Sequence, residues 1–179
     1  MLPKDAPGRD AFRFVMLDTD VNTLRNLHRK GFQGRQIQLT ENMTVGNCRK
    51  SLGEVLKEWY PESEIFEGKS MTEGAGQQRS ISRLALEYAV QSGKLAELYA
   101  EIESLREIRK DNSIQKIRFY IISSLAGGTG SGIILPLAMY LKRFVKKMEA
   151  DDLSVCKGFF LLPSGLDEDS LSQHEQRSM

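Results

Sequence analysis

The residues best suited to binding chemistry are the glycines of residues 126–132, which read Ala-Gly-Gly-Thr-Gly-Ser-Gly. Glycine has no Cβ, so the backbone there can take positive φ and approach a ligand closely. Successive backbone N–H groups, with the hydroxyls of Thr129 and Ser131, could surround a phosphate with hydrogen-bond donors. The stretch therefore predicts a phosphate-binding loop. Its candidate residues are Gly127, Gly128, Thr129, Gly130, Ser131 and Gly132.

Two other glycine-rich nucleotide motifs do not fit this stretch. A P-loop requires Gly-Lys-Ser/Thr, and no lysine occurs between Lys116 and Lys142. The dinucleotide motif G-x-G-x-x-G fails because Ile133 stands at its third glycine position when the motif is counted from Gly128. One interpretation without a ligand stays open, in which the glycines only let a strand and a helix pack closely.

Apolar patterns on both sides of the glycines predict alternating strands and helices. Nearly unbroken apolar runs predict strands, and apolar residues at spacings of three and four predict helices. The strand candidates are residues 12–17, 117–122 and 155–162, with a possible short strand at 36–39. The helix candidates are residues 21–27, 48–60, 80–92, 95–110 and 133–148. This order predicts an α/β fold, a three-layer, Rossmann-like parallel sheet with helices on both faces, and we expect residues 1–179 to form a single domain.

Polar segments follow the three main strand candidates, at residues 18–20, 126–132 and 163–165. Parallel sheets bind ligands beyond the carboxyl ends of their strands, so we expect these segments to meet at one edge. Asp18 and Asp20 have two open interpretations. Asp20 could cap the helix that follows it. Alternatively, both carboxylates could hold Mg²⁺ through water beside phosphate groups.

Composition limits the classes of partner. The chain has 25 Lys and Arg against 24 Asp and Glu, a net charge of +1, so no basic excess points to nucleic acid. Cys48 and Cys156 lie far apart without a pairing pattern, which fits a reducing compartment. No apolar run approaches the length of a membrane span. We therefore expect a cytoplasmic protein without a membrane segment.

Several stretches together resemble the tubulin/FtsZ superfamily of GTPases. Residues 126–132 resemble its glycine signature G-G-G-T-G-[ST]-G, with Ala126 at the first glycine position. Residues 15–20 resemble its second strand and acidic loop, and Gly74-Ala75-Gly76 resembles its γ-phosphate loop. Residues 74–85 are closest to bacterial tubulin-like proteins, whose G-A-G-Q-x-R-x-x-G-R-L-A pattern they follow with Ser82 at the last glycine position. Residues 159–163 resemble the strand and proline loop that lead to the ribose and base.

The resemblance implies a GTP-binding core that binds GTP or GDP with Mg²⁺ and self-associates head-to-tail into filaments or a scaffold. Residues 127–132 would hold the α- and β-phosphates, and Gly74, Ala75 and Gly76 would sense the γ-phosphate. Asp18 and Asp20 would lie near Mg²⁺. Hydrolysis would need a loop from a neighbouring subunit, so the resemblance identifies no catalytic residue in this chain.

The resemblance also implies that the tubulin-like fold is incomplete at both ends of residues 1–179. The superfamily has a first strand with its own glycine-rich loop before this region, and a long central helix after it. An alternative function is a non-catalytic assembly module with weak or lost nucleotide binding, which Ala126 and Ser82 favour. A different nucleotide-binding α/β domain, using ATP, is a third interpretation.

Overall fold

The computed structural model of the chain describes residues 8–56, 59–60, 66–72, 74–76, 78–111, 116–147 and 154–162. The predicted polar turn at residues 163–165 lies outside this described part.

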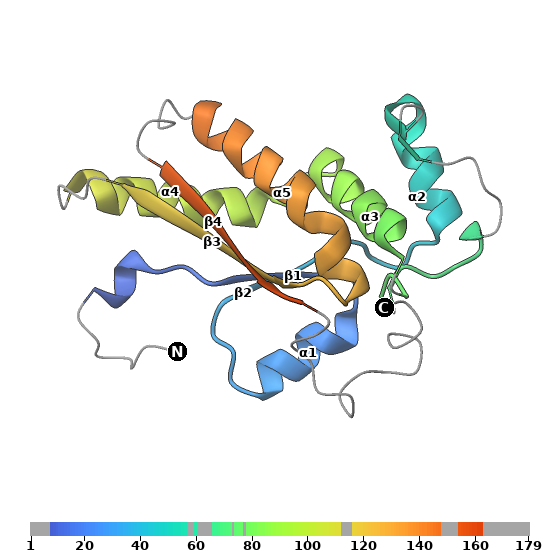
Figure 1. The fold of residues 1–179 in the computed structure, drawn as a ribbon, viewed down its shortest axis with the longest axis horizontal. Helices are drawn as coiled ribbons and strands as arrows, with labels where there is room; N and C mark the ends of the chain where they lie inside the picture. Colours follow the sequence, from blue (N-terminus) through green and yellow to red (C-terminus); the bar gives the residue numbers. More distant parts are fainter. Residues whose placement is uncertain are drawn as a thin grey trace.

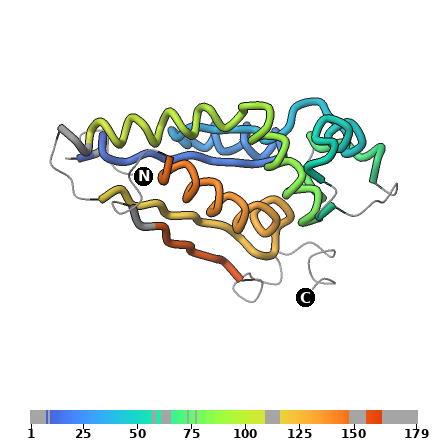
Figure 2. The backbone as a smooth tube through the Cα atoms, turned by 90° about the horizontal axis from the view of Figure 1, so that it is seen from above, coloured from blue at the N-terminus to red at the C-terminus, as the bar shows by residue number. Residues whose placement is uncertain are grey.

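The strands form two parallel pairs. β1 (Val15–Asp18) pairs with β2 (Arg35–Gln38), and β3 (Ile117–Ser124) pairs with β4 (Ser154–Leu161). The parallel direction and the alternation with helices confirm the predicted α/β class. The described residues do not form one continuous sheet, however, because the two pairs are not hydrogen-bonded to each other. In Figure 2, the traces of β1 and of the β3–β4 pair run apart.

Helices lie on both sides of the strands. In the view of Figure 1, α1 lies below the strands, whereas α3, α4 and α5 lie above them. The helices are α1 (Val21–Arg29), α2 (Val45–Leu52), α3 (Arg79–Gln91), α4 (Ala96–Asp111) and α5 (Gly128–Lys147), with short 3₁₀ segments at Arg9–Ala11 and Gly53–Leu56. The predicted helix at 95–110 is confirmed by α4 almost residue for residue.

The predicted helix at residues 48–60 is wrong at both ends. α2 begins earlier, at Val45, because the Thr44 hydroxyl caps it by accepting a hydrogen bond from the Asn47 N–H at 3.2 Å. It ends at Leu52 because Gly53 takes a φ of +51°, which an α-helix cannot continue.

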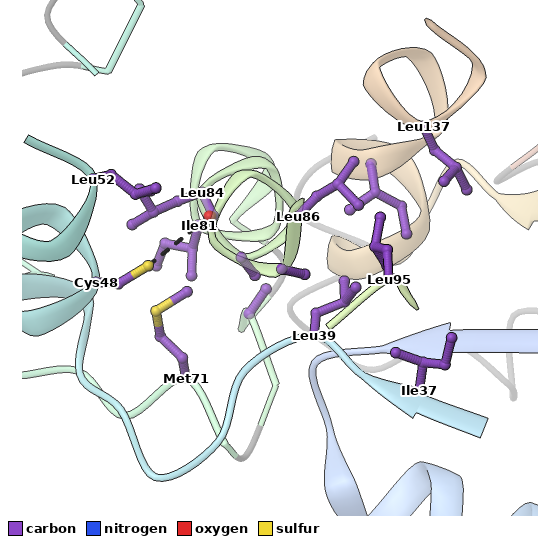
Figure 3. Packing of buried hydrophobic residues seen from close by; sticks show 14 of the residues in the cluster. Ile37, Leu39, Cys48, Leu52, Met71, Ile81, Leu84, Leu86, Leu95 and Leu137 are labelled. Atoms are coloured by element: carbon purple, nitrogen blue, oxygen red, sulfur yellow. Dashed lines mark hydrogen bonds between the residues drawn. The ribbon is translucent and has the colours of Figure 1, made fainter. Parts of the chain in front are cut away.

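Helix α3 forms the centre of the core. It packs between α2 and α5, and Figure 3 shows its leucines facing side chains from both sides. The Cys48 thiol of α2 lies 3.9 Å from the Leu84 carbonyl oxygen of α3, the contact drawn as a dashed line. Six α3 side chains are completely buried, those of Ile81, Ser82, Leu84, Ala85, Leu86 and Ala89. Because each large aliphatic side chain contributes about 1.5–3 kcal/mol on burial, α3 provides a fixed support for the loops at its amino end.

A cavity of about 980 Å³ lies between β1 and β3. Along most of its length it is apolar, lined by side chains such as Leu17, Ile102 and Ile121. At the carboxyl ends of the two strands it becomes polar, where Asp18 and Asp20 line it together with both glycine segments. The fold therefore brings the predicted site residues to one end of one cavity, except Ser131 and Gly132, which do not line it.

Candidate phosphate-binding site

The predicted glycine loop is mostly the first turn of a helix. β3 continues to Ser124 and α5 begins at Gly128, so only residues 125–127 connect them. The Ala126 N–H donates to Ser124 Oγ at 3.2 Å, and the Leu125 N–H donates to the Leu161 carbonyl at 2.9 Å. None of the four glycines between residues 127 and 132 has a positive φ. The ability of glycine to adopt a positive φ therefore does not explain the glycines of this stretch.

Close packing explains two of these glycines. A Cβ on Gly132 would lie 2.5 Å from the Arg79 carbonyl oxygen of α3, and a Cβ on Gly130 would lie 2.9 Å from the Ser124 carbonyl oxygen of β3. Real Cβ atoms do not approach backbone oxygens so closely. Gly127 differs, because a Cβ there would meet no atom within 4 Å. Close packing thus requires glycine at positions 130 and 132, whereas Gly127 faces open space.

The two hydroxyls of this segment bond to the protein. Thr129 Oγ1 donates to Asp18 Oδ1 at 2.9 Å and lies 2.9 Å from Thr19 Oγ1. Ser131 Oγ donates to the Gly127 carbonyl at 2.5 Å. Backbone N–H groups at the start of α5 are therefore the donors that remain for an anion, since the first N–H groups of a helix have no acceptor inside it.

Thr19 is a site residue that sequence reasoning missed. Its side chain is completely buried, and its hydroxyl joins the end of β1 to the start of α5 through Thr129. The only signal in the sequence was its position between two aspartates at the end of a strand.

The two aspartates have different surroundings. Asp18 Oδ1 accepts hydrogen bonds from the Asp20 N–H at 3.0 Å and from Thr129. Asp20 caps α1, since its Oδ1 accepts from the Asn22 N–H at 2.8 Å and its Oδ2 accepts from Thr23 Oγ1 at 2.9 Å. The capping interpretation of Asp20 is confirmed, and a water-mediated role at Mg²⁺ stays a prediction for both residues.

The second glycine segment uses its glycines for conformation. Gly74 and Gly76 have φ values of +95° and +56°, a region that costs other residues strain. Ala75 between them is buried, and its carbonyl oxygen accepts from Lys69 Nζ at 3.2 Å and from the Gln78 N–H at 3.1 Å. Lys69 was also missed, because it lies five positions before Gly74 in a stretch without periodicity.

This geometry agrees with a comparison of the sequence with known families. A family model described as tubulin-like matches residues 3–179. The chain belongs to the tubulin-like family. No curated protein and no solved structure matched it.

Two helices of this tubulin-like protein begin at the site without an anion of their own. The N-cap of α3, Gln78, makes no side-chain capping bond, and the residue before α5, Gly127, has no side chain to make one. Neither helix has an acidic residue in its first turn. By contrast, α1 and α2 are capped by Asp20 and Thr44. Because unpaired N–H groups and the helix dipole favour negative charge, the starts of α3 and α5 together favour an anion.

A buried serine connects these two helix starts. Ser82 of α3 is completely buried, and its Oγ donates to the Gly128 carbonyl of α5 at 2.7 Å. The hydroxyl occupies the position where the bacterial tubulin-like pattern has glycine. This contact, with the close approach of Arg79 to Gly132, fixes the first turns of α3 and α5 relative to each other.

The donor set around the two aspartates fits Mg²⁺ only with water and phosphate as further ligands. The described residues contain no group of three or more His, Cys, Asp or Glu side chains that could hold a metal ion. Mg²⁺ commonly binds through one or two carboxylates, waters and substrate phosphates, and two aspartates at the cavity meet that requirement. Among the described helices, none is long and apolar enough to cross a membrane.

Proposed function

We propose that this tubulin-like chain is the GTP-binding core of a GTPase that self-associates into filaments or a scaffold. The observation that carries the proposal is that the uncapped start of α5 and the glycine turn of residues 74–76, which precedes the uncapped start of α3, line one cavity with Asp18 and Asp20. The polar end of the cavity, where these groups meet, is the part that phosphates would occupy. Residues 1–179 act as one nucleotide-binding domain in this proposal.

The two helix starts would divide the phosphates between them. The N–H groups of residues 127–132 would hold the α- and β-phosphates, and the turn of Gly74, Ala75 and Gly76 would contact the γ-phosphate. Mg²⁺ would lie between the phosphates and the carboxylates of Asp18 and Asp20, through water. A cation is needed there because carboxylates and phosphates repel each other at close range.

Hydrolysis would proceed mainly by positioning and electrostatic stabilisation of the phosphates. The group that activates the attacking water would come from a neighbouring subunit, so no residue of this chain is assigned as the catalytic acid or base. Head-to-tail association and a cytoplasmic location complete the proposal. Family membership supports the association, and the free thiols of Cys48 and Cys156 suit a reducing compartment.

A titration of the protein with fluorescently labelled GTP and Mg²⁺ tests the proposal. We expect saturable binding that unlabelled GTP and GDP compete more effectively than ATP. Gly127→Ala is the informative variant, because its Cβ enters open space at the start of α5 and should lower affinity without disturbing packing. Gly130→Ala is unsuitable, since it would collide with β3. Absence of saturable binding would contradict nucleotide binding, and better competition by ATP would contradict the choice of guanine.

A second candidate function is a non-catalytic, tubulin-like assembly module. It is favoured by the engagement of both hydroxyls of the glycine segment, Thr129 and Ser131, with protein atoms. The dependence of GTP turnover on protein concentration separates the two functions. A GTPase completed by a neighbour shows turnover per subunit that rises with concentration, whereas an assembly module shows none at any concentration.

A further inference from the structure

We propose that Lys69 is a positioning residue that makes the site prefer a nucleoside triphosphate over a diphosphate. The inference rests on the proposed nucleotide site and assigns a role to a residue outside both glycine segments. Lys69 acts by holding the turn of Gly74, Ala75 and Gly76 from behind.

The main chain and side chain of Lys69 are both held in place. Its carbonyl accepts from the Val45 N–H at the start of α2 at 3.0 Å, and its N–H donates to the Phe66 carbonyl at 2.9 Å. The ammonium group lies 5.8 Å from the centre of the Phe66 ring, within the range of a cation–π contact. From this position Nζ donates to the Ala75 carbonyl at 3.2 Å.

This hydrogen bond sets the direction of one peptide group. In a trans peptide the carbonyl and the following N–H point in opposite directions, and the part of the chain that the structure describes contains no cis peptide bond. The Ala75 carbonyl points to Lys69, so the Gly76 N–H points to the other side of the turn. Gly74, Ala75 and Gly76 line the cavity and Lys69 does not. Lys69 therefore keeps the Gly76 N–H available to an anion on the cavity side.

The position of Gly76 supports the same conclusion. A Cβ on Gly76 would collide with Lys69 Nζ, so the ammonium lies directly against the turn. From behind the turn, its positive charge adds to the field that a terminal phosphate would meet on the cavity side. A diphosphate does not reach this turn in the proposed arrangement, so loss of the charge should weaken triphosphate binding more than diphosphate binding.

The test is a pair of titrations, with labelled GTP and labelled GDP in the presence of Mg²⁺, on wild type and three variants. Lys69→Met should lower GTP affinity about tenfold more than GDP affinity, the scale of one charge-assisted hydrogen bond. Lys69→Arg should restore most of the preference, because it keeps a charged donor. Lys94→Met is the matched control, since Lys94 pairs with the exposed Glu41 and should leave the ratio unchanged.

Each outcome separates this inference from the proposed function. Wild type that binds neither nucleotide would overturn both. Wild type that binds GTP while Lys69→Met lowers GTP and GDP affinity equally, or not at all, would overturn the role of Lys69 alone. If Lys69→Met does not fold, as judged by circular dichroism, Lys69→Gln removes the charge while keeping a donor, and it must still weaken GTP binding more than GDP binding.

Discussion

The two glycine segments of this site use the same residue for different physical reasons. Residues 127–132 contain glycines in ordinary helical or extended backbone, two of which leave room for neighbouring backbone. Gly74 and Gly76 instead take positive φ, and a Cβ on Gly74 would meet only Asp20, at 3.5 Å. Gly130 and Gly132 are limited by space, Gly74 by conformation, and Gly76 by both. A glycine pattern in a sequence does not reveal which of the two limits applies.

This difference predicts that Gly132→Ala lowers the free energy of unfolding more than any other glycine substitution considered. The added Cβ would lie 2.5 Å from the Arg79 carbonyl oxygen and 2.7 Å from Ser82 Cβ, so α3 and α5 would have to move apart. Overpacking of this kind costs about 1–3 kcal/mol, and we expect the upper end because backbone is involved. Urea denaturation monitored by circular dichroism measures the loss.

Gly127→Ala is the matched control in the same segment, because the added Cβ has room there. It adds the same methyl group where no atom lies within 4 Å and φ is not positive. We expect the free energy of unfolding to stay within about 0.5 kcal/mol of wild type, as for surface substitutions without special features. An equal loss in both variants would contradict the packing explanation.

Gly74→Ala tests the conformational limit of the second segment. Alanine at a φ of +95° is strained although the space around it is nearly free. We expect a loss of about 1–2 kcal/mol in the free energy of unfolding. Gly74→Asn should lose less, since asparagine tolerates the left-handed region better than alanine. A larger loss for asparagine would show that space, and not conformation, limits this position.

Ser82→Ala tests the connection between the two segments. The variant removes the hydrogen bond to the Gly128 carbonyl, and we expect a loss of about 1 kcal/mol in stability, the usual net value of such a bond. Ser80→Ala, two residues earlier in the same helix, is the matched control and should have little effect. Thermal unfolding of the two variants side by side provides the comparison, and equal midpoints would contradict the role of Ser82.

An effect confined to alkaline pH, and absent under ordinary conditions, concerns Cys48, which packs against α3. Burial raises the pKa of this thiol from 9.0 to about 12, so the folded state favours the neutral form. The unfolded chain loses the proton first, so the stability contributed by the neutral thiol is complete below pH 9 and is lost as the pH rises toward 12. Above pH 9 this thiol should lower the free energy of unfolding of wild type by up to about 1.4 kcal/mol per pH unit. Cys48→Ala lacks the thiol and should not show this part of the decline. A difference in slope below pH 9 would contradict this assignment.

The spacing of apolar residues predicted those helices and strands in which the apolar pattern is uninterrupted. Residues 117–122, 155–162 and 95–110 became β3, β4 and α4 because their apolar spacing has one physical solution. The start of α5 at Gly128 was not predictable, since glycine disfavours helices and only packing against α3 and β3 overrides that preference. The end of α2 was also not predictable. The apolar spacing continues beyond Leu52, but the positive φ of Gly53 ends the helix there.

For the site, the sequence predicted that residues 18–20 and the glycines after β3 lie together, but not how their side chains pair, and the third expected segment, residues 163–165, lies outside the described residues. Asp18, Asp20 and both glycine segments follow strands or precede helices, and parallel strands bring such segments to one edge. The contacts of Thr19, Lys69 and Ser82 depend on residues at least six positions away, and none belongs to a periodic pattern. The separation of the strands into two pairs depends on long-range pairing, which local pattern does not encode.

The most direct test of the central claim follows backbone amide signals of ¹⁵N-labelled protein by NMR during titration with GTP and Mg²⁺. The account predicts that the amides of Gly128, Thr129 and Gly76 shift along one saturation curve, since one ligand contacts both helix starts. Amides of α2, away from the cavity, should not shift. Movement of only one segment, two different curves, or no movement at either segment would contradict a single phosphate site built from both.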